Sequence, residues 1–244
     1  EAGIAQRYYK MTGAVSMSFE ARKDYPHTAR WGAARLYLRT PNGISISGHE
    51  GAKAYALSCP GGAGVQVLDM PGMASAADLN ITRGSATLFG TALETDGGVV
   101  IDNFSLRGTS GNTLAEVPEA TLREFDRLRP YDLIILQYGV NAVTEHSTAE
   151  QLKTYMKEMQ KVVEHIKRSF PESSILIAGT PDRGSKTEPD GTMRGIKMLS
   201  GYQEQLASDM KVGFLSILGA MGGPGTMRNL VDKYGWGSKD YVHI

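Results

Sequence analysis

The chain has 244 residues with 26 basic and 26 acidic side chains, so its formal net charge at pH 7 is zero. This balance argues against a nucleic-acid or anionic-membrane partner, because such partners bind through clustered lysine and arginine. A single cysteine, Cys59, excludes an internal disulfide and any multi-cysteine zinc site, and no run of about 18 apolar residues could form a membrane span.

The first part of the chain, residues 1–97, has the pattern of a β-rich domain. Short segments with apolar and polar residues in alternation are separated by turn signals, such as the Thr-Pro-Asn-Gly sequence at 40–43. The segments expected to form strands are 14–20, 35–39, 44–47, 65–68 and 81–89. Short strands at this spacing, joined by glycine-rich turns, favour an antiparallel sandwich.

From residue 98 onward, strand-like and helix-like segments alternate, which predicts a parallel sheet with helices on both faces. The expected strands are 98–101, 132–138, 174–179 and 212–217, and the expected helices are 114–129, 148–169 and 196–210. The helix at 148–169 is the clearest, because its apolar residues repeat at helical spacing on one face. The sequence therefore predicts two domains, 1–97 and 98–244.

The loops that follow the predicted parallel strands contain the chemically interesting residues, as expected for ligand sites in such sheets. Gly111 lies in a small-residue turn before a helix, where it could point a backbone N–H at an anion or serve only as a structural turn. Asn141 could donate from its carboxamide or cap the next turn. Asp240 and His243 are three residues apart, so the carboxylate could orient the imidazole as a general base, although this spacing also arises by chance.

Taken in order, these blocks resemble those of the SGNH hydrolases, also called GDSL-type lipases and esterases. The blocks are N-x(4)-G-T-S-G-N-T from residue 103, Q-Y-G-V-N at 137–141 and D-Y-V-H at 240–243. The glycine-rich stretch 218–227 is similar to that of secreted Bacteroidetes members, which carry an inserted β-sandwich. The resemblance implies a three-layer αβα, flavodoxin-like sheet over 98–244, preceded by a jelly-roll, carbohydrate-binding-like β-sandwich over 1–97.

The same resemblance implies a role for each site residue. Gly111 would donate its backbone N–H and Asn141 its side-chain amide to an oxyanion hole, while His243 would be the general base and Asp240 its orienting carboxylate. It implies no cofactor and no metal. The implied partner is a carbohydrate ester, namely the O-acetyl groups of polysaccharide or peptidoglycan, with no nucleic acid and no membrane span. The implied location is periplasmic or extracellular, and no feature indicates an oligomeric state.

One element of the family pattern, the Gly-Asp-Ser block with the nucleophilic serine, does not occur in this sequence. Ser47, Ser58 and Ser110 lie in other contexts, and Cys59 is expected to be a small buried residue. Ala142 stands where the third block usually has an aspartate. We therefore expect the chain to be part of a longer protein whose serine lies upstream, and to be inactive as an esterase by itself. The alternative is a whole protein that has lost its nucleophile and only binds glycan.

Two functions of other kinds stay open at this point. In a glycan-binding module without catalysis, aromatic side chains of the β-rich half would stack on sugars, although such side chains also pack in cores. Those aromatic residues are Tyr8, Tyr9, Trp31, Tyr37 and Tyr55. A lipase or acylhydrolase of the same fold would instead cleave long-chain lipid esters.

Overall fold

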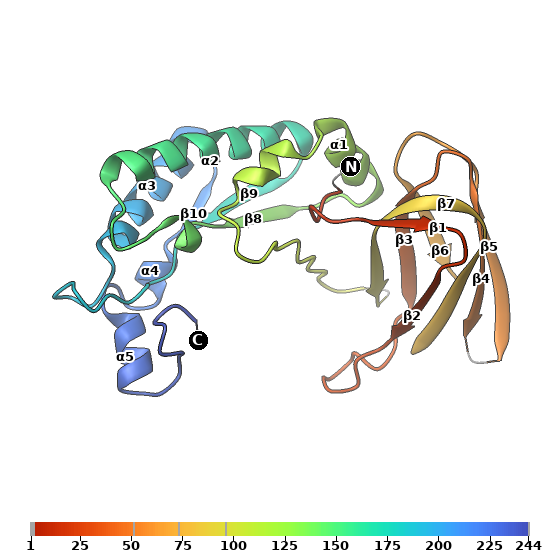
Figure 1. Ribbon diagram of the computed structural model, residues 1–244, viewed down its shortest axis with the longest axis horizontal. Helices are drawn as coiled ribbons and strands as arrows, with labels where there is room; N and C mark the ends of the chain where they lie inside the picture. Colours follow the sequence, from red (N-terminus) through yellow and green to blue (C-terminus); the bar gives the residue numbers. More distant parts are fainter. Residues whose placement is uncertain (1–2, 51, 73, 96, 244) are drawn as a thin grey trace. The chain divides into compact units, whose positions relative to one another are not determined.

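The structure, a computed structural model, describes residues 3–50, 52–72, 74–95 and 97–243 (Figure 1). It has a mixed α/β fold with one antiparallel and one parallel sheet. Two compact units are formed by Glu1–Leu106 with Ala120–Arg129, and by Arg107–Glu119 with Pro130–Ile244. The domains 1–97 and 98–244 stay a prediction, and the two units are described in turn.

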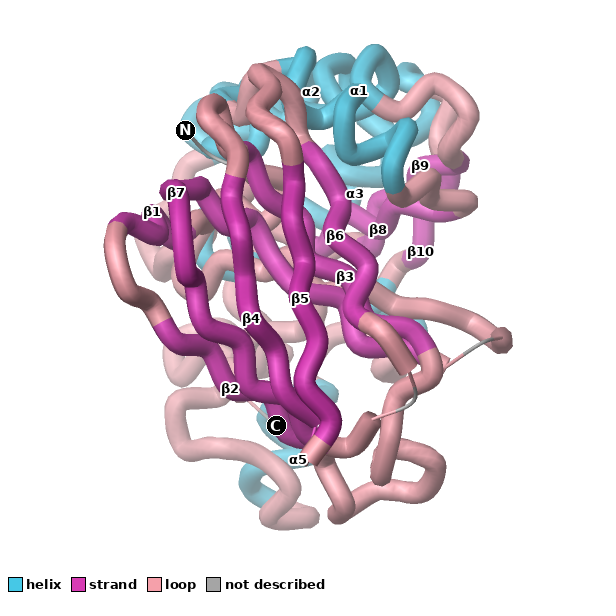
Figure 2. Tube along the Cα trace, turned by 90° about the vertical axis from the view of Figure 1, so that its right-hand side faces the viewer, coloured by secondary structure: helices cyan, strands magenta, loops and turns pink. Residues whose placement is uncertain are grey.

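The first unit contains the antiparallel sheet. Its strands are β1 (Tyr9–Thr12), β2 (Ser16–Glu20), β3 (Ala33–Arg39), β4 (Ile44–Glu50), β5 (Lys53–Cys59), β6 (Gln66–Met70) and β7 (Ala76–Glu94). The strand order is β5-β4-β7-β3-β6, and β1 and β2 also pair with β7 (Figure 2). The long strand β7 pairs with β2 and β4 along its first part and with β1 and β3 along its second part. A separate two-sheet sandwich therefore stays a prediction for this unit.

Alternating apolar residues of these strands build the core of the first unit. Leu36, Leu38, Ile46 and Leu79 are almost fully buried in one cluster. Because side chains alternate between the two faces of a strand, Leu36 and Leu38 share this cluster, whereas Tyr37 between them packs in a second cluster with Phe89 and Phe125. The sequence did not predict β1 or β5, both of which carry mostly exposed or half-buried side chains and so lack a strong pattern.

The aromatic side chains considered for sugar stacking have different environments. Trp31 and Tyr37 are each only 4% exposed and pack in the core, so neither can present a ring to a sugar. Tyr55 is half-buried, whereas Tyr8 and Tyr9 are 39% and 71% exposed. The stacking hypothesis is therefore wrong for Trp31 and Tyr37. It stays a prediction for the exposed residues Tyr8 and Tyr9.

Helix α1 (Glu119–Leu128) packs on the first unit through both charge and aromatic contacts. Glu124 accepts a hydrogen bond from the Arg39 guanidinium at 3.1 Å and one from the Val65 backbone N–H at 3.0 Å. Phe125 lies against the rings of Tyr37 and Phe89. These contacts place the helix against the sheet although it begins 25 residues after the end of β7 in sequence.

The second unit contains the parallel sheet, with strand order β10-β9-β8. Its elements are η1 (Asn112–Glu116), β8 (Leu133–Gln137), η2 (Val140–Ala142), α2 (Ala149–Ser169), β9 (Ser174–Ala178), α3 (Arg194–Met210), β10 (Gly213–Leu215), α4 (Ile217–Ala220) and α5 (Thr226–Asp232). The predicted strands at 132–138 and 174–179 and the predicted helices at 148–169 and 196–210 are confirmed. The strand expected at 212–217 is shorter, Gly213–Leu215, because Ser216 caps helix α4, which begins at Ile217. Thr148 and Gln151 form a capping box that starts α2 at the predicted place.

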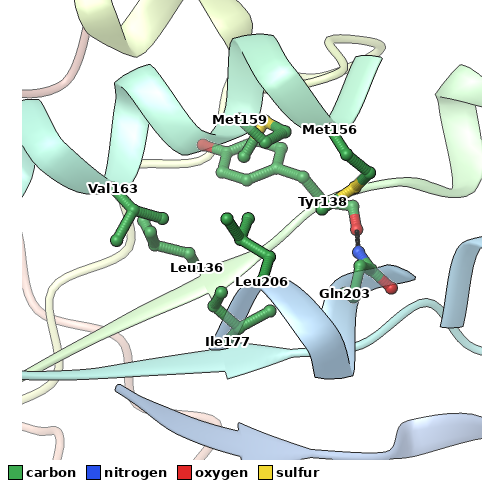
Figure 3. Close-up of a pocket in the computed structure, with 8 residues that line it drawn as sticks. All are labelled: Leu136, Tyr138, Met156, Met159, Val163, Ile177, Gln203 and Leu206. Carbon is green, nitrogen blue, oxygen red and sulfur yellow. Dashed lines mark hydrogen bonds between the residues drawn. The ribbon is translucent and has the colours of Figure 1, made fainter. Parts of the chain in front are cut away.

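Helices α2 and α3 cover one face of this sheet, where their apolar residues meet Leu136 and Ile177 (Figures 1 and 3). On the other face the large side chains of Leu133, Ile135 and Leu215 are 49%, 55% and 48% exposed. Because parallel sheets are usually buried on both faces, this exposed apolar face is unusual. Helices on both faces, as a three-layer fold requires, thus stay a prediction.

Two expected elements differ from the structure. Residues 98–101 do not form a strand: Val99 and Ile101 are highly exposed, and no strand in the described ranges pairs with them. An apolar run becomes a strand only where a neighbour supplies hydrogen bonds, which periodicity cannot reveal. The predicted helix at 114–129 is interrupted by Pro118, which separates η1 from α1 because proline has no N–H to continue a helix.

Candidate active site

The turn before η1 depends on the conformational freedom of Gly111. Its φ of 93° lies in the left-handed region, and a Cβ at this position would lie 2.6 Å from Cγ of the Tyr138 ring. The preceding carbonyl, of Ser110, accepts a hydrogen bond of 2.8 Å from the hydroxyl of Tyr155 on α2. Sequence position alone suggested a special turn here, and the Tyr138 ring gives the physical reason for the glycine.

Gly111→Ala should therefore destabilise the second unit more than the same substitution at a glycine whose only special feature is a positive φ. Gly108 is a matched control, because its φ is 80° but no atom lies within 4 Å of a Cβ there. We expect Gly108→Ala to cost about 1 kcal/mol from backbone strain. Gly111→Ala should cost about 1–3 kcal/mol more from the contact with Tyr138. Urea unfolding measures the loss of stability in each variant. Equal losses would show that the contact with the Tyr138 ring does not require a glycine at position 111.

Asn141 lies on η2, directly after β8, and its side chain is exposed. Its Nδ2 donates a hydrogen bond of 3.2 Å to the carbonyl of Thr109, two residues before Gly111. The structure therefore brings the Gly111 turn and the Asn141 turn together, although only the Asn141 turn follows a strand of the parallel sheet. A carboxamide has two N–H donors, so one of them is engaged here and the second can serve another acceptor.

A buried glutamine holds the ends of β8 and β9 beneath these turns. Gln203 of α3 is 4% exposed and donates to the Tyr138 carbonyl at 2.8 Å (Figure 3). It also accepts from the Thr180 N–H at 2.8 Å. The cavity beside it measures about 10 Å³, near the minimum for one water molecule, and apolar side chains line most of it. This space belongs to the packing of the core and is too small for a substrate.

Near the end of the described chain, Asp240 and His243 form the predicted pair. Nδ1 of His243 lies 2.7 Å from Oδ2 of Asp240, whose Oδ1 accepts the backbone N–H groups of Val242 and His243 at 2.9 and 3.2 Å. With Nδ1 on the carboxylate, Nε2 is the ring nitrogen available to take a proton. The His243 side chain is 75% exposed, so a reacting group can reach it.

This geometry makes a prediction about the ionisation of Asp240. The hydrogen bond from the His243 ring, followed by those from the two backbone N–H groups, holds the pKa of the Asp240 carboxyl well below its usual range. A folded pKa below the unfolded value means that the pair persists above the unfolded pKa and is lost only as the pH falls through the folded one. NMR titration of the Asp240 carboxyl carbon should show a midpoint below about 3.9, and His243→Ala should raise it. An unchanged midpoint in the variant would show that the ring does not bind the carboxylate.

The structure joins the predicted site residues into two groups. Gly111 and Asn141 lie in turns that are bonded to each other, and Asp240 and His243 form the second group. Within the part of the chain that the structure describes, no hydrogen bond connects the two groups directly. Both groups do contact the loop after β9, which sequence reasoning missed. Its position after a parallel strand was the one signal that could have indicated it.

Neither Cys59 nor Ser110 has the environment of a nucleophile. Cys59 is 7% exposed, as the sequence predicts, with its Sγ 2.9 Å from Oε1 of Gln66. Burial raises the pKa of its thiol, which disfavours the reactive thiolate. The Ser110 hydroxyl is 3.4 Å from Oδ1 of Asn112 within its own turn, and no base contacts it in the described structure.

The described residues hold neither a cluster that could bind a metal ion nor a helix that could span a membrane. No three His, Cys, Asp or Glu side chains lie close enough there to hold a metal ion. None of the helices in that part combines the length and hydropathy that crossing a bilayer requires.

A family model for GDSL-like lipases and acylhydrolases matches residues 63–243, which is more than half of the chain. The chain belongs to the GDSL-like lipase/acylhydrolase family. Asp240 and His243 of this GDSL-like chain lie at the end of the matched range, and Gly111 and Asn141 lie inside it. The resemblance of the three sequence blocks to the family is thus confirmed.

One solved structure is similar in fold over the whole chain, and two others show a weaker likeness. A structure of a peptidoglycan O-acetylesterase is 20% identical, with a TM-score of 0.73; the match covers all of the GDSL-like chain and 67% of that structure. A lipase/acylhydrolase from Enterococcus faecalis is 16% identical, with a TM-score of 0.34 and coverages of 52% and 60%. A family two carbohydrate esterase from Cellvibrio japonicus is 11% identical, with a TM-score of 0.30 and coverages of 85% and 88%. Comparison with curated proteins gives no match.

Proposed function

We propose that this protein is a carbohydrate esterase that removes O-acetyl groups from polysaccharide or peptidoglycan by a Ser-His-Asp mechanism. The observation that carries the proposal is the 2.7 Å pair of Asp240 and His243, in which the carboxylate engages Nδ1 and leaves Nε2 for proton transfer. The family membership supports ester hydrolysis, and the adjoining Gly111 and Asn141 turns supply hydrogen-bond donors of the kind that stabilise an oxyanion.

The proposed reaction has two steps, acetylation of the serine and hydrolysis of the acetyl-serine. Nε2 of His243 takes the proton of a serine hydroxyl while the serine oxygen attacks the acetyl carbonyl carbon. The Gly111 N–H and the second Nδ2 hydrogen of Asn141 donate to the resulting oxyanion. The imidazolium returns its proton to the departing sugar oxygen, which leaves an acetyl-serine. Water then attacks this ester with the same base, releasing acetate and restoring the serine.

The serine of this scheme is proposed to lie on polypeptide outside the present chain. The exposed apolar face formed by Leu133, Ile135 and Leu215 supports this, because a parallel sheet is stable when both of its faces are covered. In the described structure β8 is an edge strand with β9 as its partner, so a further strand could pair with it. We propose that this additional polypeptide completes a three-layer αβα sheet and brings the nucleophile to His243.

The substrate class is proposed from the similarity to the peptidoglycan O-acetylesterase structure, whose match extends over the whole of this chain. A polysaccharide or peptidoglycan ester is found outside the cytoplasm, so we propose a periplasmic or extracellular location. The first unit, which we propose to be a carbohydrate-binding-like β-sandwich, would then hold the glycan. The exposed ring of Tyr9 is its best available stacking surface.

Activity assays on two forms of the protein test the proposal. The protein expressed from its complete reading frame should release acetate from O-acetylated peptidoglycan and cleave p-nitrophenyl acetate faster than p-nitrophenyl palmitate. The present chain alone should not exceed the buffer rate. Turnover by the present chain that His243→Ala abolishes would contradict an external serine. A faster rate on palmitate would indicate a lipid esterase instead. Glycan binding without turnover by the complete protein, unaffected by His243→Ala, would contradict hydrolysis and favour a binding protein.

A further inference from the structure

Three consecutive residues after β9, Asp182, Arg183 and Gly184, contact the start of α5, the Asn141 turn and the Asp240–His243 loop, respectively. The chain reaches this loop from Ala178 at the carboxyl end of the central strand, so the loop starts from a rigid, buried position between β8 and β10. Loops in this position are well placed to connect sites on the neighbouring strand ends.

Arg183 holds the turn that presents Asn141. Its Nη1 donates to the Val140 carbonyl at 2.9 Å and to the Val143 carbonyl at 2.8 Å. These two carbonyls lie on either side of Asn141, so a single charged donor ties both ends of the turn. Hydrogen bonds from a charged group are stronger than neutral ones, and the Arg183 side chain is itself partly buried.

Asp182 holds the beginning of α5, the helix that leads toward Asp240. It is fully buried, its Oδ2 accepts the Met227 N–H at 2.8 Å, and its Oδ1 accepts the hydroxyl of Thr192 at 2.7 Å. The same Thr192 oxygen accepts the Gly225 N–H at 2.6 Å. The carboxylate therefore fixes two backbone amides at the start of α5, one directly and one through Thr192.

Gly184 contacts the Asp240–His243 loop itself. Its N–H donates to the carbonyl of Tyr241 at 2.9 Å, and a Cβ at position 184 would lie 2.6 Å from Cβ of Tyr241. Tyr241 has a φ of 57°, an uncommon conformation for a non-glycine residue, and its hydroxyl donates to Asp232 of α5 at 2.8 Å. The conformation of the catalytic loop thus depends on close backbone contact with Gly184.

We propose that Asp182, Arg183 and Gly184 form a positioning segment that sets the oxyanion donor Asn141 and the Asp240–His243 pair relative to each other. The inference rests on the proposed function for the roles of those residues. None of the three acts on the substrate; they act by holding the two loops that do. Misplacement of reacting groups by about 1 Å is enough to cost about 10²-fold in rate.

Gly184→Ala is the sharpest test, because it adds one methyl group against Tyr241 and removes no charge. Gly201→Ala is its matched control, since no atom lies within 4 Å of a Cβ at that position in α3. In the present chain, NMR titration of the Asp240 carboxyl should show its midpoint raised toward about 3.9 in Gly184→Ala and unchanged in Gly201→Ala. An Asp240 midpoint that stays at the wild-type value in Gly184→Ala would overturn the inference.

Arg183 provides a second test in case Gly184→Ala does not fold. The Asn141 side-chain amide signals should move in Arg183→Met and stay near their wild-type positions in Arg183→Lys, which keeps a charged donor. Arg168→Met is the control, because it removes an ion pair of the same unit, with Glu119. If Arg183→Met lowers the melting temperature but leaves the Asn141 signals in place, Arg183 has a merely structural role and the inference is overturned.

Kinetics of the protein from the complete reading frame separate this inference from the proposed function. If that protein cleaves p-nitrophenyl acetate, Gly184→Ala and Arg183→Met should lower kcat by about 10²-fold with little change in KM, and Arg183→Lys should restore most of the loss. An unchanged kcat would overturn the positioning role. If no variant and no wild-type protein shows turnover, the proposed function fails, and the NMR comparisons still decide whether the segment holds the two loops.

Discussion

Replacing His243 by alanine is expected to lower kcat for acetyl-ester hydrolysis by about 10⁴- to 10⁶-fold in the protein expressed from its complete reading frame. The loss is large because, in the proposed mechanism, the imidazole both takes the proton of the nucleophile and returns it to the leaving group. Asp240→Asn should cost about 10⁴-fold, since the amide no longer favours the ring tautomer in which Nδ1 carries the proton. Steady-state kinetics with p-nitrophenyl acetate measure both effects.

His146 provides the control for this experiment. It is an exposed histidine on the loop before α2, and it takes no part in the proposed chemistry. His146→Ala should leave kcat unchanged. A double variant of Asp240 and His243 should be no slower than His243→Ala alone, because the two residues act as one unit. Additive losses, or a His243→Ala variant that retains more than a few per cent of the rate, would show that another group is the base.

Arg129→Met is expected to lower the free energy of unfolding of the first unit by about 3–5 kcal/mol. The guanidinium pairs with Glu94 and Asp102, and the three side chains are only 13%, 14% and 20% exposed. The hydrogen bond with Asp102 and then that with Glu94 raise the pKa of Arg129 above its already high value, so the group stays charged. Methionine would fill similar space and leave two largely buried carboxylates without this partner.

The two tryptophans allow the first unit to be followed alone. Trp31 is 4% exposed in that unit, whereas Trp236 is 66% exposed in the other. In a Trp236→Phe background, urea unfolding monitored by fluorescence therefore reports the first unit. Arg22→Met is the control: its ion pair with Asp24 is about 70% exposed, so its loss should cost at most about 1 kcal/mol. Similar losses in the two variants would show that burial does not strengthen the Arg129 cluster.

Most regular elements could be predicted from the sequence, because hydrophobic period is a local property. The helix at Ala149–Ser169 and the strands at Leu133–Gln137 and Ser174–Ala178 lie where the pattern places them. The strand predicted at 98–101 does not form, although its residues are apolar enough. Strand formation depends on a hydrogen-bonding partner from elsewhere in the chain, which is not a local property. The burial of Trp31 and Tyr37 likewise could not be predicted from the sequence, since aromatic residues suit both a core and a binding face.

In the candidate site, too, local features could be predicted from the sequence and long-range contacts could not. The pairing of Asp240 with His243 could be predicted because the two residues are three apart. The Gly111 and Asn141 turns were both expected after parallel strands, but only Asn141 follows one, so the strand-end rule does not explain their contact. Asp182 and Arg183 could not be found in this way. Their partners, Met227 and the carbonyls around Asn141, lie about 40 residues away in either direction, and such hydrogen bonds leave no spacing pattern.

By itself, the sequence determined the family, the order of the family's sequence blocks and the local elements that carry them, because each of these depends on short stretches of consecutive residues. Only the tertiary structure decided that the loop after β9 contacts both the Asn141 turn and the Asp240–His243 loop, and that Leu133, Ile135 and Leu215 remain exposed on one face of the parallel sheet. The physical reason is that burial and long-range hydrogen bonds are properties of packed surfaces, which are set by which segments meet and not by the residues of any one segment.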